Sequence, residues 1–192
     1  MFEAISGLSA AFGLSGSAGL NAYIPLLVVA LAARFPMSDP LVDLRAPYDL
    51  LGSWWAIGLI AVLLVVEIVA DKIPAVDSIN DGIQTFVRPA AGAILFAGSA
   101  NVITDIHPIL ALAAGLLLAG GVHATKAAAR PMVTVATAGV GNPVVSTLED
   151  IVATVVSVLA VVLPIIAAVL LLGAILFIIY AVRRWRRRKL VV

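Results

Sequence analysis

The sequence has no cysteine and few charged residues. The absence of cysteine excludes disulfide bonds, thiolate metal sites and cysteine nucleophiles. Charged residues make up 12% of the chain, against roughly 25% in an average soluble domain, while 62% of the residues are hydrophobic. This composition predicts an integral membrane protein and argues against soluble, disordered and nucleic-acid-binding classes, which need polar or basic surfaces.

Basic residues are concentrated at the end of the chain. Six of the 12 lysines and arginines lie between Arg183 and Lys189, so the rest of the chain carries six basic and 11 acidic residues, a formal charge of −5. Basic residues beside spans mark the cytoplasmic side and attract anionic lipid headgroups. We therefore expect residues 183–192 to be a basic cytoplasmic tail that contacts anionic lipids, and residues 1–182 to form a single transmembrane domain.

Apolar stretches predict an all-α, polytopic fold with about five or six transmembrane helices, since each span needs about 20 apolar residues. Trp54–Ala70 is a clear span that begins with two tryptophans. Residues 89–104 and 108–125 predict a helical hairpin. The polar and apolar positions of residues 75–88 alternate at helical spacing, which predicts a separate amphipathic helix, too short to span, at an interface or dipping into the protein.

The uncharged stretch 151–182 is too long for one span, because a single helix would be about 48 Å long. Two helices that turn near Pro164 are favoured slightly over one kinked helix, although the stretch has no polar turn residue.

Two glycine-bearing segments, near residues 13–21 and 137–143, predict broken or re-entrant helices. Each contains an Ala-Gly pair followed within three residues by an asparagine, Asn21 or Asn142, which suggests an internal repeat. The backbone groups freed by a break must be buried in protein or line a wet cavity. Small transporters bring such breaks together at a central site. The alternatives are that the glycines only allow close helix packing and that the asparagines only cap helices.

Ionisable residues in or beside the apolar stretches are candidate site residues, because charges are costly in a membrane. Glu67 and Asp71 lie on one side of a helix, with Lys72 adjacent. Glu67 is either a proton or cation carrier or a membrane-edge residue paired with a base. Asp77 and Asp81 repeat the spacing of four, and with Asp71 they predict a monovalent or divalent cation site. The alternative for these aspartates is a solvated helix face.

Basic candidates complement these carboxylates. They would act as counter-charges or anion ligands, or they would only mark the cytoplasmic side. Pairing of Arg88 or Arg130 with Asp77, Asp81 or Glu149 would neutralise both partners. The alternative interpretation of Glu149, and the interpretation of Asp150, is a charge at a helix start. The basic candidates are Arg88, His123, Lys126 and Arg130.

Several short motifs are distributed over nearly the whole chain. They are Gly19-Leu20-Asn21-Ala22-Tyr23, Ala70-Asp71-Lys72-Ile73-Pro74 with Asp77, Arg88-Pro89, and Gly141-Asn142-Pro143 with Ser146, Glu149 and Asp150. Together they resemble a bacterial membrane-protein family catalogued as domain of unknown function 4126. The resemblance implies a polytopic inner-membrane protein and singles out these polar positions, but it implies no activity and no substrate.

These observations predict a small transporter or channel of the bacterial inner membrane, with a cytoplasmic C-terminus. It would pass an ion or small polar solute through a site formed by broken helices and charges. A chain of 192 residues is expected to form a homo-oligomer to seal a pathway. One alternative is a membrane-embedded enzyme acting on a lipid-linked substrate, which ranks lower because no nucleophile–base pair is identifiable. The other is a non-catalytic scaffold, which packed break residues would favour.

Overall fold

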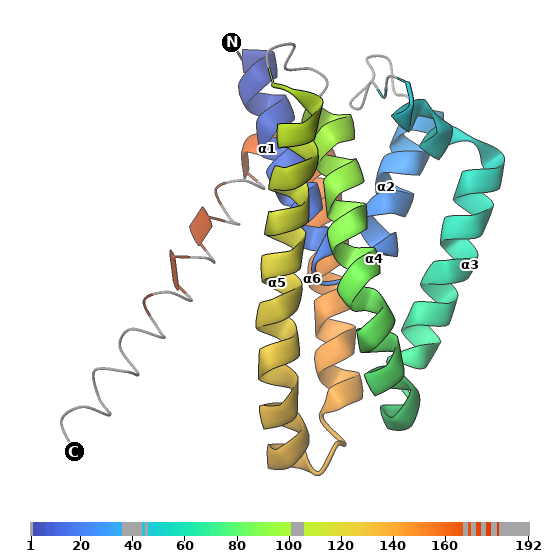
Figure 1. The fold of residues 1–192 in the computed structure, drawn as a ribbon, viewed down its shortest axis with the longest axis vertical. Coiled ribbons are helices and arrows are strands. Elements are labelled where there is room, and N and C mark those ends of the chain that lie inside the picture. The colour runs from blue at the N-terminus through green and yellow to red at the C-terminus, as the bar shows by residue number, and fades with distance from the viewer. Residues whose placement is uncertain are drawn as a thin grey trace.

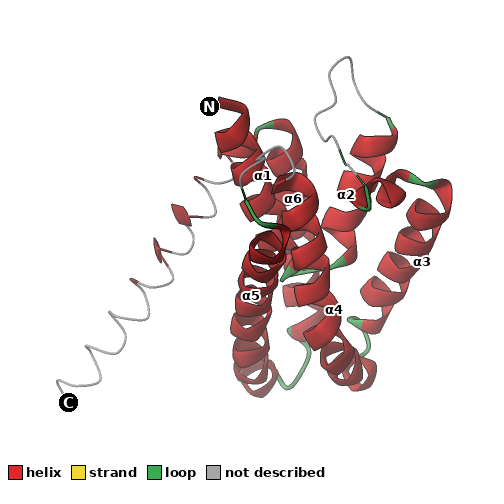
Figure 2. Cartoon of the chain, turned by 45° about the horizontal axis from the view of Figure 1, so that its top comes forward, coloured by secondary structure: helices red, strands yellow, loops and turns green. Residues whose placement is uncertain are grey.

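A computed structural model describes residues 2–35, 44, 46–100 and 106–166, and positions 169, 172, 173, 176, 177 and 180. The side chains of residues 2, 3, 74, 75, 77, 78 and 100 fall outside this description. The described part is all-α (Figures 1 and 2). Its elements are α1 (Phe2–Ala18), α2 (Tyr23–Arg34), the 3₁₀ helix η1 (Tyr48–Gly52), α3 (Trp54–Ala70), α4 (Pro74–Ala100), α5 (Pro108–Thr137) and α6 (Asn142–Val162).

Helices α4 and α5 form a long antiparallel pair, and α1 packs against this pair and against α6 (Figure 1). Helix α2 packs against α3 and α6. The turn between α1 and α2 lies inside the bundle, because Gly19 contacts the middle of α5 at Ala119 and Val122. The chain therefore places a helix break deep within the helical bundle.

The break expected across residues 13–21 is shorter than predicted. Helix α1 continues through its central glycines to Ala18. It stays helical because its small residues serve contacts with other helices: Ser15 Oγ donates to the Gly92 carbonyl and Ser17 Oγ to the Ala153 carbonyl, both at 2.8 Å. The next helix begins after Asn21, whose Oδ1 accepts the backbone N–H groups of residues 23 and 24 and so caps α2.

Helix α3 has the predicted bounds, Trp54–Ala70, and Ser53 Oγ caps it by accepting the Ala56 N–H at 3.2 Å. The separate amphipathic helix expected at 75–88 is wrong, because α4 is continuous from Pro74 to Ala100 with Pro89 inside it. Proline removes one helical hydrogen bond, but close packing against a neighbouring helix can hold such a helix together. Helix α5 supplies that packing to α4.

The broken segment expected at 131–148 is also shorter. Helix α5 continues through Pro131 to Thr137. The chain then reverses in a tight turn in which Ala138 and Gly139 have positive φ values of 50° and 85°. Helix α6 begins at Asn142. The break near 137–143 is thus a turn between two antiparallel helices at one end of the bundle (Figure 1).

Helix α6 ends at Val162, two residues before Pro164, and residues 164–166 are helical again. A break therefore lies near that proline, as both interpretations of the stretch 151–182 expect. The basic tail, residues 183–192, lies outside the described residues, as does much of the stretch after residue 166. Among the described helices, α5 and α6 are long and apolar enough to cross a membrane. Fewer helices meet this criterion than the five or six expected, because α2 and α3 have only 12 and 17 residues and α4 carries many polar residues.

The first half of α4 directs apolar side chains outward and polar side chains inward. On α4, Ile79, Ile83 and Phe86 are exposed by 69%, 57% and 79%. The polar face of the same helix is turned inward, with Gln84 and Arg88 exposed by 2% and 0%. Soluble proteins bury apolar faces and almost never bury unpaired charges fully. The polar side of residues 75–88 therefore faces the interior of the protein, which was one of the two placements expected for this segment.

A pair of glycines tests the contact between α4 and α5. A Cβ at Gly115 would lie 2.6 Å from Phe96 Cβ and would also meet the Gly92 carbonyl, whereas nothing lies within 4 Å of a Cβ at Gly121. We expect Gly115→Ala to lower stability by about 1–3 kcal/mol through overpacking. Gly121→Ala should be neutral or stabilising by up to about 1 kcal/mol, since alanine favours helix. Thermal unfolding in detergent measures both, and equal midpoints would contradict this packing.

Candidate functional site

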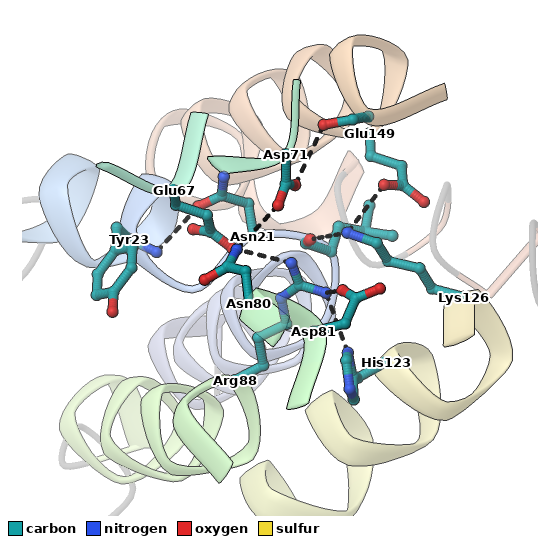
Figure 3. A network of polar contacts seen from close by, with 12 residues as sticks. Asn21, Tyr23, Glu67, Asp71, Asn80, Asp81, Arg88, His123, Lys126 and Glu149 are labelled. Carbon is teal, nitrogen blue, oxygen red and sulfur yellow. Dashed lines mark hydrogen bonds and ion pairs between the residues drawn. The ribbon is translucent and has the colours of Figure 1, made fainter. Parts of the chain in front are cut away.

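An ion pair between α3 and α4 lies at the centre of the buried polar residues. Arg88 Nη2 donates to Glu67 Oε1 at 2.9 Å (Figure 3). The side chains are exposed by 0% and 1%, so the pair is removed from solvent. Arg88 faces inward because it shares the inward polar face of α4 with Asp81 and Gln84, at helical spacings of three and four.

Arg88 also contacts His123 on α5 and Asp81 on its own helix. Its Nη1 lies 3.0 Å from His123 Nδ1 and 3.7 Å from Asp81 Oδ1. A guanidinium group can only donate, so His123 Nδ1 accepts and the neutral ring carries its proton on Nε2. That Nε2 lies 3.1 Å from Thr85 Oγ1, which itself donates to the Asp81 carbonyl. A hydrogen-bonded chain thus runs from Arg88 back to the α4 backbone.

A second cationic centre, Arg130 on α5, joins carboxylates from three other helices. Its Nη1 donates to Asp81 Oδ2 of α4 at 3.3 Å. Its Nη2 lies 3.6 Å from Asp71 Oδ2, at the end of α3, and 3.5 Å from Glu149 Oε2 of α6. Lys126, one turn earlier on α5, lies 2.9 Å from the same Glu149 oxygen. These contacts hold the ends of four helices together by charge.

Asp71 is the most completely bonded of the carboxylates. Asn80 Nδ2 donates to its Oδ1 at 2.9 Å, and Ser146 Oγ donates to its Oδ2 at 3.2 Å. With Arg130 on the same Oδ2, the Asp71 side chain links α3 to α4, α5 and α6. A buried carboxylate with several donors keeps its charge at the lowest cost.

The break between α1 and α2 joins the same region. Lys126 Nζ donates to the Leu20 carbonyl at 3.1 Å, which satisfies a backbone group freed by the break. Asn21 Nδ2 donates to Asp150 Oδ1 at 2.9 Å. Asp150 Oδ2 lies 4.0 Å from Lys72 Nζ, which donates to Thr147. The break is thus tied to α5 and α6 by side chains of opposite sign.

We call this connected set the charge network, and it unites most of the predicted site residues. Arg88 and Arg130 pair with Asp81, and Arg130 with Glu149, as proposed from the sequence. The members predicted from the sequence are Asn21, Glu67, Asp71, Lys72, Asp81, Arg88, His123, Lys126 and Arg130.

One predicted residue stands apart from these contacts. The Asn142 side chain exchanges hydrogen bonds with Thr134 at the α5–α6 end of the bundle, at 3.0 and 3.2 Å. The first break lies against the middle of α5 instead, so the expected meeting of the two breaks at one central site is wrong. The side chain of Asp77 lies outside the described residues.

The interpretation of Glu149 and Asp150 as charges at a helix start, which was the alternative to pairing for Glu149, is wrong. Glu149 and Asp150 do not begin a helix, because α6 starts at Asn142, and both face the interior instead. A signal exists in the sequence: small or polar residues recur every three or four positions along the buried side of α6. They are Asn142, Ser146, Glu149, Asp150, Ala153 and Ser157.

The predicted divalent-cation site gains no support from the described side chains. Among them, no group of three or more histidines, aspartates and glutamates is arranged to hold a metal ion. Asp71 and Asp81 lie close to the Arg130 guanidinium. The protein itself therefore supplies the positive charge that a bound metal ion would bring to these carboxylates.

A few buried polar atoms at the centre of the charge network have no hydrogen-bond partner among the described residues. Glu67 Oε2 and Arg88 Nε belong to the central ion pair, and Gln84 Oε1 and Asp81 Oδ1 lie on the same face of α4. Unsatisfied buried groups are rare and costly in proteins. They mark the part of the charge network where a ligand, a water molecule or a proton would be bound most favourably.

The chain belongs to the family described as Domain of unknown function (DUF4126), whose model matches residues 8–184. The match covers every element described above apart from the first turns of α1. No curated protein matches the chain, and no solved structure does. The family description names no activity, so function is argued from the charge network.

The central ion pair makes a specific prediction for stability. Arg88→Met leaves Glu67 buried and unpaired, which should cost about 3–5 kcal/mol, whereas the double variant Glu67→Met/Arg88→Met should recover most of that loss. The double-mutant cycle is measured by unfolding in detergent. Lys72→Met, at a side chain that is 37% exposed, is the matched control. A cycle without coupling would show that the pair does not form.

Proposed function

We propose that this protein is an integral membrane protein that passes an ion or a small polar solute across the bilayer, with the charge network as its binding site. We further propose that it lies in the bacterial inner membrane as a homo-oligomer, with residues 183–192 in the cytoplasm against anionic lipids. The basic tail and the resemblance of the motifs are the sequence features behind this orientation and location.

A membrane location accounts for the large apolar side chains that are exposed on the bundle. Apolar side chains point outward on α3 and α4, where Leu59, Val62, Ile79 and Phe86 are all exposed. Water would disfavour this surface, whereas lipid matches it. Helices α5 and α6 have the length and composition of spans.

We further propose that α1 and α2 form a re-entrant hairpin. The start of α1 and the end of α2 lie at the same end of the bundle (Figure 1). Helix α2 has 12 residues and is about 18 Å long, which is too short to cross a hydrocarbon core of about 30 Å. The hairpin would therefore enter the membrane, turn at residues 19–22 beside Lys126, and leave on the same side. Such backbone is tolerated at membrane depth only where protein or a cavity surrounds it.

The single observation that carries the transport proposal is the fully buried Glu67–Arg88 pair. Buried ion pairs add little net stability, because desolvation offsets their attraction. Ionisable groups inside membrane helices are therefore retained mainly for function. Hydrogen bonds from Lys126 to the Leu20 carbonyl and from Asn21 to Asp150 hold the α1–α2 turn against α5 and α6. Passage of a solute would require this turn to separate from α5 or α6.

A scaffold function is the second candidate, and one observation favours it. A Cβ at Gly19 would lie 2.6 Å from the Ala119 carbonyl and 2.5 Å from Val122 Cβ, and Asn21 is exposed by 1%. The break is thus tightly packed, as a static assembly module requires.

The membrane proposal is tested with single cysteines, since the chain has none of its own. Phe86→Cys lies on the exposed apolar side of α4, and Asp49→Cys lies on η1. In sealed vesicles of both orientations, a membrane-impermeant maleimide should label Asp49→Cys in one orientation and Phe86→Cys in neither. Detergent should then make Phe86→Cys reactive. Rapid labelling of Phe86→Cys in intact vesicles would contradict a lipid-facing α4.

The transport proposal is tested in liposomes with imposed gradients of H⁺, Na⁺, K⁺ and chloride. We expect flux of at least one of these ions with the wild-type protein and its loss with Asp71→Asn, which removes a charge next to Arg130. The matched control Asp49→Asn, an exposed carboxylate outside the charge network, should keep the flux. Absence of flux for every ion with a folded wild-type protein would instead favour the scaffold.

A further inference from the structure

The charge network has more acidic than basic members. Among the described side chains, its interior part holds four carboxylates against three cations, a formal charge of −1 with His123 neutral, and the Lys72–Asp150 pair adds one charge of each sign. Net charge is costly in an apolar interior. One additional positive charge would therefore be bound favourably. The carboxylates are Glu67, Asp71, Asp81 and Glu149, and the cations are Arg88, Lys126 and Arg130.

Glu67 and Asp81 each have a carboxylate oxygen without a hydrogen-bond partner among the described residues, and Glu67 is the more deeply buried of the two, with its side chain exposed by 1% against 21%. The Oε1 of Glu67 accepts from Arg88, and its Oε2 is the oxygen without a partner. Asp71, by contrast, has donors to both oxygens, and Glu149 has two cations at one oxygen. A proton on Oε2 would remove the net charge and turn this atom into a donor. Gln84, one turn before Arg88 on the inward face of α4, has an unpartnered Oε1, which is an acceptor of the required kind.

Arg88 is the dominant cation near Glu67 among the described residues. Helix α3 packs against α2, η1 and α4, and η1 lies at the opposite end of α3 from Glu67. The charges of Arg88 on α4, Lys126 on α5 and Asp71 at the end of α3 act electrostatically on Glu67. Glu67 in turn acts on Tyr23 of α2. His123 and Asp81 lie on the other side of Arg88. Among the described cations only Arg88 makes direct contact with the Glu67 carboxylate.

We propose that Glu67 binds and releases a single proton and that Arg88 exchanges its carboxylate partner when it does so, which makes the proton the ion that the charge network handles. The inference rests on the proposed transport function. The proton adds to the free oxygen of the Glu67 carboxylate and forms a neutral carboxylic acid. The Arg88 guanidinium, 2.9 Å from Glu67 and 3.7 Å from Asp81, then has Asp81 as its remaining anionic neighbour.

This exchange connects protonation to helix contacts. Glu67 belongs to α3, whereas Asp81 and Arg88 both belong to α4. Protonation of Glu67 therefore replaces an ion pair between helices by one within a helix, and it weakens the contact between α3 and α4. A two-state helix contact biased by one proton is the element that a proton-coupled transporter needs.

The first test reads protonation itself and does not depend on transport. Infrared difference spectra of the purified full-length protein in lipid are recorded across a pH titration, in H₂O and D₂O. We expect a protonated-carboxyl band that shifts on deuteration, is absent from Glu67→Gln and is retained in the matched control Asp49→Asn, which removes an exposed carboxylate outside the charge network. Glu67→Asp keeps a carboxyl group and should restore the band at a changed frequency. A band that persists unchanged in Glu67→Gln would overturn the proposal.

The second test separates this inference from the proposed function. In liposomes, an imposed pH gradient should drive proton flux that falls to the level of protein-free liposomes with Glu67→Gln and is partly restored with Glu67→Asp. Flux of Na⁺, K⁺ or chloride with no proton movement would overturn the inference and support transport. A band that depends on Glu67, without flux of any ion, would support the proton site and contradict transport.

Discussion

The structure depends on one constraint: charges enclosed by an apolar bundle must find their partners inside the protein. The Glu67–Arg88 pair is the clearest instance, with both side chains almost completely buried. Around it, carboxylates of α3, α4 and α6 converge on cations of α4 and α5. Because removing one member strands its partner in a low-dielectric interior, these contacts fix how the helices sit relative to one another.

The same constraint explains the placement of the first helix break. A turn in the middle of a bundle frees backbone groups that water cannot reach. Lys126 binds the freed Leu20 carbonyl, and Asn21 both caps α2 and binds Asp150. The break is therefore not an independent feature of the chain. The charge network anchors this break, so a movement of the break would change the contacts of Lys126 and Asp150.

The outward face of the bundle complements this interior. Gln84 and Arg88 are buried on α4 while Ile79 and Phe86 are exposed, so the helix is amphipathic in the direction that suits lipid outside and polar contacts within. For a chain of a family described only as a domain of unknown function, this inversion and the buried ion pair are the two physical facts on which function can be argued. Both are the basis of the proposal that the protein handles an ion in a membrane.

The sequence alone determined the all-α class, the bounds of α3, the break at Asn21 and most of the charged candidates. These follow from composition and from local capping, which act over a few residues. Only the tertiary structure decided that α4 and α5 continue through Pro89 and Pro131, because packing between helices outweighs the local cost of proline. It also decided that Arg88 pairs with Glu67, 21 residues away, and that Asn142 stays apart, because spacing along a chain does not fix which helices meet.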